Sequence, residues 1–303
     1  MAVPAGKSWR PCRPKPAGAT EPMRMEQTQW RGIAVWELQS ADALARISCF
    51  GGQLLSWQPA GASEVFWCSP QLQPPRPLRG GVPLCWPWFG KHPHDPQAPA
   101  HGLARTAAWQ LDRVQLLEDG RMHLRLSPLA SLHPGLAVEQ QLWIGRHLEQ
   151  AITSHNVGSQ VEPLSQALHS YFQVADITAV RLLGVDGHRY SDALADGRLE
   201  LQQGDWQFDH QQHGGRCDRI YLDVAGPVIL ADCVQGRRLQ LQAQGGRALV
   251  LWTPGPELGQ QISDVGSGWQ HYVCIEVANA GTDTRQLLPG QSHTLQQSIH
   301  LLD

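Results

Sequence analysis

Two residues in separate apolar segments have the chemistry for proton transfer. Glu276 is the one carboxylate in the apolar run at residues 269–279, and burying a carboxylate with neither partner nor chemical role costs several kcal/mol. His169 lies in an alternating segment at residues 164–172, and an imidazole can donate or accept a proton near neutral pH. A lone histidine on a strand is more often structural. Together, His169 and Glu276 are the minimum for paired acid and base catalysis, and we predict that role for them.

A segment rich in glycine and proline, residues 78–105, combines three aromatic residues with an arginine near each end. As core residues, Trp86, Trp88 and Phe89 would only fill space between strands. Beside arginines, such a wall suits a phosphorylated sugar, because sugar rings stack on aromatic faces and arginine binds phosphate through paired hydrogen bonds. We therefore predict that Arg79, Arg105 and Trp88 contact the substrate.

No segment gives a strong signal for a metal or a cofactor. His92, His94 and Asp95 lie in a proline-rich loop, where closely spaced histidines are more often solvated than metal-bound. Neither the Gly-x-Gly-x-x-Gly pattern nor a P-loop is present. We predict no metal and no cofactor, and we assign the remaining polar candidates, His213, Glu162 and Asp264, to turns or the surface.

The elements that must position these residues have the pattern of an antiparallel β-sandwich. Beyond residue 30, short alternating runs are separated by glycine, proline or asparagine about every ten positions. Gly51 and Gly52, between residues 43–47 and 53–57, predict a hairpin. No sustained 3.6-residue period appears, and 30 glycines and 22 prolines would interrupt one. We predict an all-β fold with little helix.

Composition indicates one globular domain. No linker-like stretch divides the 303 residues after position 30, so we predict a domain at 26–303 and a disordered extension at 1–25 that lacks the apolar core of a secretory signal. A net charge of -3 gives no general attraction to nucleic acid or membranes. Seven scattered cysteines without a Cys-x-x-Cys pair indicate reduced thiols. We expect a cytoplasmic monomer with no nucleic-acid or membrane partner.

Five motifs follow one another in the order of a known family. They are RGGVP with WPWFG at 79–90, HGLAR at 101–105, LHSYF at 168–172, DRIY at 218–221 and VCIE at 273–276. In these motifs the chain resembles the glucose-6-phosphate 1-epimerase branch of the aldose 1-epimerase superfamily, over nearly all of its length after residue 30.

The resemblance implies a galactose-mutarotase-like antiparallel β-supersandwich that interconverts the α and β anomers of a hexose 6-phosphate, with glucose 6-phosphate as the first candidate. His169 would protonate the ring oxygen while Glu276 takes the proton of the anomeric hydroxyl. Glu276 must be ionised to do so, and we expect nearby donors or cations to offset its burial. The substrate contacts that the resemblance implies are Arg79, Arg105, His101 and Asp218.

Other functions remain open at this stage. A mutarotase of unphosphorylated aldoses would gain little from two guanidinium groups. A non-catalytic sugar-phosphate binding protein would need neither a proton donor nor a base, yet the chain has both His169 and Glu276. A carbohydrate-binding module of a secreted enzyme fits poorly with seven cysteines and no signal peptide.

Overall fold

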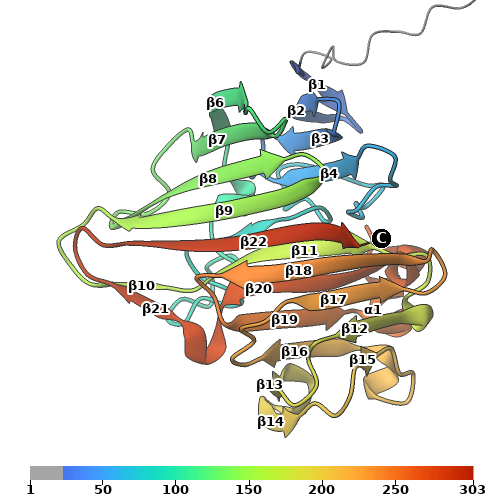
Figure 1. The fold of residues 1–303 in the computed structure, drawn as a ribbon. Coiled ribbons are helices and arrows are strands. Elements are labelled where there is room, and N and C mark those ends of the chain that lie inside the picture. Colours follow the sequence, from blue (N-terminus) through green and yellow to red (C-terminus); the bar gives the residue numbers. More distant parts are fainter. Residues whose placement is uncertain (1–22, 303) are drawn as a thin grey trace, which may run out of the picture.

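The computed structural model describes residues 23–302, which form antiparallel sheets joined by short turns (Figure 1). Sheets of seven and nine strands dominate, and a four-stranded and a two-stranded sheet complete the fold. The predicted all-β antiparallel architecture is confirmed. No helix in this part of the chain is long and apolar enough to cross a membrane.

The two large sheets contain strands from the central and C-terminal parts of the chain. The seven-stranded sheet has the order β14 (Arg198–Leu201), β13 (Arg189–Asp192), β16 (Cys217–Tyr221), β19 (Ala248–Thr253), β20 (Tyr272–Asn279), β11 (Gln166–Gln173) and β5 (Leu84–Cys85). The nine-stranded sheet has the order β15 (Trp206–Gln207), β12 (Val180–Leu183), β17 (Val228–Asp232), β18 (Arg237–Gln244), β22 (Ser292–Leu302), β9 (His147–Asn156), β8 (Leu136–Ile144), β7 (Met122–Pro128) and β6 (Trp109–Leu116).

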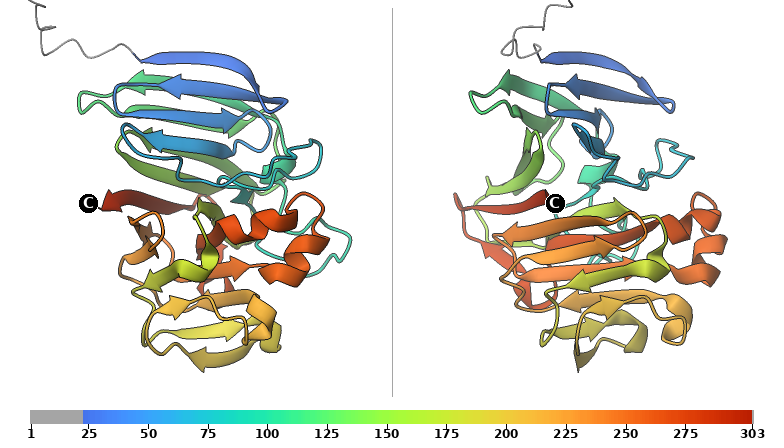
Figure 2. Two further views of the ribbon diagram at one scale, coloured as in Figure 1. Left: turned by 90° about the vertical axis from the view of Figure 1, so that its right-hand side faces the viewer. Right: turned by 45° about the vertical axis from the view of Figure 1, so that its right-hand side comes forward.

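The smaller elements extend this framework. The four-stranded sheet contains, in order, β1 (Arg24–Trp30), β2 (Ile33–Gln39), β3 (Ala43–Ser48) and β4 (Leu54–Pro59), and β10 (Glu162–Leu164) pairs with β21 (Arg285–Leu287). The helices are α1 (Gly255–Gln261) and the 3-10 turns η1 (Ala104–Thr106), η2 (Ile177–Ala179), η3 (Ala193–Ala195), η4 (His213–Gly215), η5 (Gly266–His271) and η6 (Gly281–Asp283). Figure 2 shows the segment with α1 and η5 to one side of the sheets.

The two faces of the seven-stranded sheet have different environments. Alternate side chains of a strand point to opposite faces. Leu168 and Ser170 of β11 belong to the face that looks toward the nine-stranded sheet, because the Ser170 hydroxyl donates to Gln297 of β22. Ile275 and Val277 of β20 join Leu168 in the main hydrophobic core. His169 and Glu276 therefore lie on the opposite face.

A chain of buried amides links the two sheets within the core. Ser170 donates to Gln297, Gln297 to Gln150, Gln150 to Gln140, and Gln140 to the carbonyl oxygen of Gly52. The side chains of all four polar residues are buried, and each bond points in the same direction along the chain. Aligned hydrogen bonds in a low dielectric polarise one another, so this chain fixes how β11, β22, β9 and β8 are placed.

The observed secondary structure matches the sequence-based predictions with two exceptions. The predicted hairpin forms as β3 and β4, and helix is confined to short segments. The strand predicted for residues 269–279 begins only at Tyr272, because Gly266, at φ +53°, lets residues 266–271 turn as η5 instead. Of the predicted extension at 1–25, residues 1–22 lie outside the described part, and Arg24 and Met25 pair with β2 as the start of β1.

Candidate active site

His169 and Glu276 lie directly opposite each other on the neighbouring strands β11 and β20. Residues paired in this way share a face and have their Cβ atoms roughly 5 Å apart. Nε2 of His169 is 3.3 Å from Oε1 of Glu276, and the two side chains are 11% and 2% exposed. The sheet register alone thus brings the two residues predicted to transfer protons into contact.

Each member of this pair keeps one polar atom without a partner. Nδ1 of His169 and Oε2 of Glu276 are buried, and neither makes a hydrogen bond with any described residue. Buried polar atoms in folded proteins are nearly always paired, so two such atoms in adjacent residues need a physical reason. No described residue supplies a partner for either atom.

The protonation of the pair is governed by burial. Burial raises the pKa of Glu276 well above its ordinary value, the negative charge of Asp218 adds to this, and Arg105 opposes it. Burial also lowers the pKa of His169, and the nearby His101 and Arg105 lower it further. The expectation that neighbours offset the burial of Glu276 is therefore wrong, since burial outweighs the cation. Burial thus favours the uncharged form of both side chains.

His101 is a neutral hydrogen-bond donor beside this pair. Its ring centroid is 5.7 Å from that of His169. The backbone N–H of Gly90 donates to Nδ1 of His101 at 3.3 Å, which leaves the ring proton on Nε2. Burial and the charge of Arg105 lower the pKa of His101 to about 4. Its backbone is left-handed, with φ +62°, which is unfavourable for a histidine and common at functional sites.

Arg79 and Arg105 line one cavity of about 480 Å³, together with Arg76 and the segment at residues 261–264. Both guanidinium groups are near enough to the proton-transfer pair to lower the pKa of His169. Arg105 donates through Nη2 to the carbonyl oxygen of Ala100, while its buried Nε has no partner among the described residues. The cavity therefore collects positive charge that also acts on His169.

Two glycines allow the arginine-bearing segments to pack closely. Gly81, two residues after Arg79, has φ +58°, and a Cβ there would lie 2.1 Å from the carbonyl oxygen of Leu54. Gly102 has φ +77°, and its Cβ would lie 2.0 Å from the carbonyl oxygen of Trp86. No other residue fits either position without moving the backbone, which gives these two family motifs a structural reason.

Asp218 lies on the same face of the sheet as His169 and Glu276. It pairs with Trp252 of β19, and Trp252 pairs with Cys274, two residues before Glu276 in β20. Burial raises the pKa of Asp218. Its position, two strands away from Glu276 in the sheet order, places it at the side of the same face, where a sugar hydroxyl group is a suitable partner.

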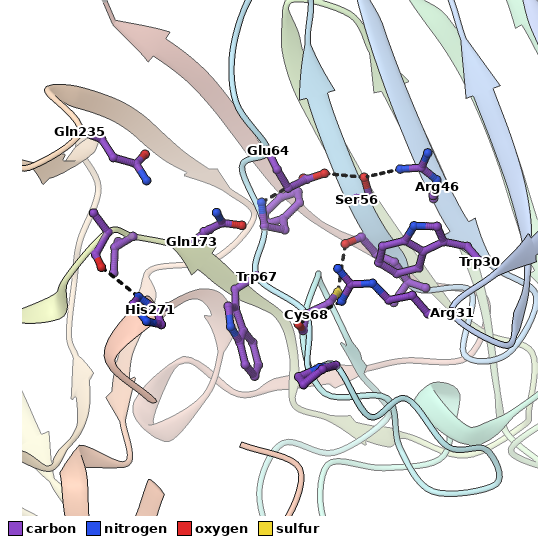
Figure 3. Close-up of a pocket in the computed structure, with 15 residues that line it drawn as sticks. Trp30, Arg31, Arg46, Ser56, Glu64, Trp67, Cys68, Gln173, Gln235 and His271 are labelled. Carbon is purple, nitrogen blue, oxygen red and sulfur yellow. Dashed lines mark hydrogen bonds between the residues drawn. The ribbon is translucent and has the colours of Figure 1, made fainter. Parts of the chain in front are cut away.

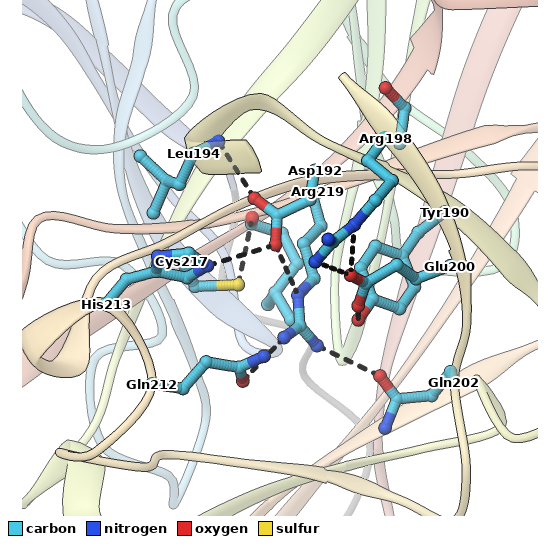
Figure 4. A network of polar contacts seen from close by, with 12 residues as sticks. Tyr190, Asp192, Leu194, Arg198, Glu200, Gln202, Gln212, His213, Cys217 and Arg219 are labelled. Atoms are coloured by element: carbon cyan, nitrogen blue, oxygen red, sulfur yellow. Dashed lines mark hydrogen bonds and ion pairs between the residues drawn. The ribbon is translucent and has the colours of Figure 1, made fainter. Parts of the chain in front are cut away.

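Arg219, the next residue, belongs to a different network on the other face of the sheet (Figure 4). It donates to Gln202 at 3.1 Å and to Gln212 at 2.6 Å. The carboxylate of Asp192 lies 4.0 Å from its Nε and 3.5 Å from Nε2 of His213. These groups satisfy one another, so we assign the network, including His213, a structural role.

The predicted aromatic wall does not form as one surface. Trp86 is fully buried in the main core and donates to Ser154. Trp88 lines a separate cavity of about 400 Å³ with His92 and His94, and donates to the carbonyl oxygen of Pro99. Phe89 lines the same cavity as Trp88 and also makes an edge contact with His101, with the ring centroids 5.0 Å apart.

The histidine loop beside Trp88 uses its polar atoms internally. Nδ1 of His92 accepts the backbone N–H groups of His94 and Asp95. No set of three or more His, Cys, Asp or Glu side chains within residues 23–302 has the arrangement of a metal site. Glu162 lines the same cavity and is not near the catalytic pair in the sheet order.

Three residues near the site were not predicted to belong to it. Tyr171 stacks on His169, and its place two residues further along the same strand was a usable signal. Asp264, expected at the surface, instead forms an ion pair with Arg79. Arg76 lines the arginine cavity from an exposed turn. The sequence carries no local signal for Asp264, because its partner Arg79 lies 185 positions away in the chain.

A larger hollow, of about 640 Å³, lies between the four-stranded sheet and the end of β11 (Figure 3). Its polar side chains bind one another. The Ser56 hydroxyl donates to Glu64 and receives a hydrogen bond from Arg46, and His271 contacts the carbonyl oxygen of Ala175. No residue lining it has an unpartnered buried polar atom within the described chain. It therefore lacks the feature that marks the His169 and Glu276 pair.

Within the described residues, an antiparallel β-sandwich thus carries a histidine and glutamate pair and an arginine-lined cavity. The family model for aldose 1-epimerase matches residues 34–300, and the chain belongs to the aldose 1-epimerase family. It is 33% identical over 83% of its length to a protein of Escherichia coli K12, and 31% identical over 82% to one of Salmonella typhimurium, with 84% of each relative covered. Both carry the provisional name glucose-6-phosphate 1-epimerase.

Solved structures agree with this assignment. A Salmonella typhimurium protein provisionally described as a mutarotase superposes with a TM-score of 0.83 at 27% identity, covering 92% of this chain and 94% of that one. A galactose mutarotase-like protein from Lactobacillus casei superposes with a TM-score of 0.67 at 16% identity, covering 88% and 100%. The second likeness shows the fold alone, and it confirms the predicted galactose-mutarotase-like sandwich.

Proposed function

We propose that this protein interconverts the α and β anomers of a hexose 6-phosphate, with glucose 6-phosphate as the first candidate. The observation that carries the proposal is the buried contact between His169 and Glu276, each with one unpartnered atom, next to a cavity lined by arginines. Family membership and the names of the two bacterial relatives support the same activity.

The proposed reaction needs two proton transfers. Glu276 takes the proton of the anomeric hydroxyl and His169 donates one to the ring oxygen as the bond between C1 and that oxygen breaks. The open-chain aldehyde rotates about C1–C2, and the ring closes with the roles reversed. Atoms and electrons balance without a hydride acceptor or a group carrier.

A proton shared by His169 and Glu276 would explain how the pair reaches its active form. A substrate hydroxyl that donates to Oε2 of Glu276 would favour the carboxylate form. Because Oε1 lies 3.3 Å from Nε2 of His169, the proton leaving Glu276 has a direct path to the imidazole. Glu276 then becomes a base and His169 an acid at the moment the sugar is in place.

The phosphate would lie in the cavity of Arg79 and Arg105. A phosphate monoester carries nearly two negative charges at pH 7 and accepts paired hydrogen bonds from arginine. His101 and Asp218 would contact hydroxyl groups of the ring, as donor and acceptor respectively. Trp88 is not part of this proposal, since it lines another cavity. The six cysteines within residues 23–302 are free, which supports a reducing compartment, the cytoplasm, as part of the proposal.

The test is anomer exchange measured by NMR on glucose 6-phosphate, glucose and galactose. We expect the protein to accelerate exchange of glucose 6-phosphate well above exchange of the two neutral sugars. Equal acceleration of the neutral sugars would favour an unphosphorylated substrate. Binding of glucose 6-phosphate with no acceleration would replace the enzyme by a sugar-phosphate binding protein.

A further inference from the structure

Asp264 contacts Arg79 in an unusual way for a surface ion pair. Both of its carboxylate oxygens lie 3.0 Å from Nε of Arg79, so the carboxylate is centred on that one nitrogen. The side chains of Arg79 and Asp264 are only 29% and 26% exposed. The terminal Nη1 and Nη2 groups of Arg79 make no hydrogen bond with the described residues, so four N–H donors remain for something else.

Hydrogen bonds of Ser69 connect the backbone of Asp264 to the segment that carries Arg79. The Ser69 hydroxyl donates to the backbone carbonyl oxygen of Asp264 at 2.6 Å. The backbone N–H of Ser69 in turn donates to the carbonyl oxygen of Arg79. These contacts tie the turn between α1 and η5 to the segment that carries Arg79, and they fix the carboxylate relative to the guanidinium group.

The charge of Asp264 is unfavourable for the ligand expected here. Its neighbours around the cavity include three arginines, Arg76, Arg79 and Arg105, and among the described residues Asp264 is the one carboxylate lining that cavity. A negative charge beside a phosphate site repels the phosphate. The geometry must therefore contribute something that outweighs this repulsion.

We propose that Asp264 is a positioning residue that orients Arg79, so that its two terminal nitrogens face the phosphate of the substrate. This inference rests on the proposed function for the identity of the ligand. A guanidinium group on a long side chain loses rotational freedom when it binds phosphate, and an arginine already held at Nε loses less. Selectivity for the phosphorylated sugar then depends on a residue that need not touch the sugar.

The direction in which Asp264→Ala changes the affinity for glucose 6-phosphate distinguishes a positioning role from simple charge repulsion. If only charge mattered, Asp264→Ala would remove a repulsive group and tighten binding of glucose 6-phosphate. If Asp264 positions Arg79, the same change should raise the KM for glucose 6-phosphate roughly tenfold, with kcat and the activity on glucose nearly unchanged. Asp264→Asn keeps one acceptor oxygen and should recover most of the loss. Glu257→Ala, an exposed carboxylate on α1 outside the cavity, is the matched control and should behave as the parent.

Two further measurements close the test. Arg79→Ala and the double variant Arg79→Ala/Asp264→Ala should have the same KM, because Asp264 acts through Arg79. Calorimetric titration with glucose 6-phosphate tests positioning apart from catalysis, and Asp264→Ala should raise the Kd roughly tenfold. An unchanged or lower Kd, or additive effects in the double variant, overturns the role of Asp264. A parent protein that binds glucose 6-phosphate without exchanging its anomers overturns the proposed function and leaves this inference standing.

Discussion

The imidazole of His169 lies flat against the ring of Tyr171, with the ring centroids 4.8 Å apart and the planes 11° apart. Tyr171 is in turn held by Trp67 and Tyr272, whose ring centroids are 6.1 Å and 5.2 Å from its own. This aromatic support limits rotation of the imidazole and keeps Nε2 directed at Glu276.

We expect Tyr171→Leu to lower kcat roughly 2- to 10-fold, since an aromatic pair contributes about 0.5–1.5 kcal/mol beyond simple burial. Tyr171→Phe keeps the ring and should remain near the parent. Steady-state rates of anomer exchange check both variants, with melting temperatures as the folding control. Parental turnover in Tyr171→Leu would show that the stacking is incidental.

Glu276→Gln should lower turnover about 100- to 10,000-fold while binding of glucose 6-phosphate changes far less. Glutamine keeps the shape and polarity of the side chain but cannot accept the anomeric proton. NMR exchange rates and a calorimetric Kd separate the two effects. Near-parental exchange in this variant would end the proton-transfer mechanism proposed for the pair.

The same substitution should change the pH dependence of stability. Burial raises the pKa of Glu276 well above 4.5, its ordinary value in an unfolded chain. The protonated Glu276 side chain stabilises the folded protein fully when the pH is below the unfolded pKa. This contribution is lost as the pH rises through the folded pKa. Glu276→Gln removes that loss, so its melting temperature should match the parent near pH ~4 and exceed it near pH ~8. Thermal unfolding at both pH values checks this, and a constant difference between them would argue against a raised pKa.

Arg105→Ala should raise the KM for glucose 6-phosphate roughly 10- to 100-fold, because a charge-assisted contact worth about 1.5–3 kcal/mol is lost. The kcat/KM for glucose should change much less. Arg113→Ala, which removes an exposed arginine of β6, serves as the charge control. If Arg105→Ala leaves the preference for the phosphorylated sugar intact, the phosphate does not bind where we place it.

Gln150→Leu interrupts the buried amide chain at its middle. Nε2 of Gln297 and Oε1 of Gln140 would both lose their partners, at a cost of about 1–3 kcal/mol each. We expect the free energy of unfolding to fall by about 2–5 kcal/mol, measured by denaturant titration. Gln244→Leu, at an exposed position of β18, should change it by less than about 0.5 kcal/mol. Equal losses of stability in the two variants would show that the buried amide chain has no special role in stability.

The strands, and the burial of the two residues proposed to transfer protons, could be anticipated because strand alternation is a local property. Glu276 stood out as a charge in an apolar run, and such a run is buried wherever its strand lies in the sheet. That His169 sits directly opposite Glu276 depends on which strands become neighbours. No local pattern encodes this pairing, and only the family resemblance suggested it.

The loops were less predictable because they lack a periodic pattern and make contacts with residues far away in the sequence. Trp88 lies among glycines and prolines, where no period tells which way a side chain points, and it turned out to line a different cavity from Arg79. Asp264 and Arg79 are 185 positions apart in the sequence. A contact of that kind arises from the fold as a whole, and a single sequence offers no means of finding it.

The direct pairing of β11 with β20 also bears on how such a protein can evolve. His169 and Glu276 keep their geometry for as long as the register of two central strands is kept. Arg79, Arg105 and Asp264 lie outside those strands, in turns and connections, the parts of a fold that vary most between relatives. Descendants could therefore exchange one sugar substrate for another by changing connecting segments alone, with the proton-transfer chemistry inherited intact from the sheet.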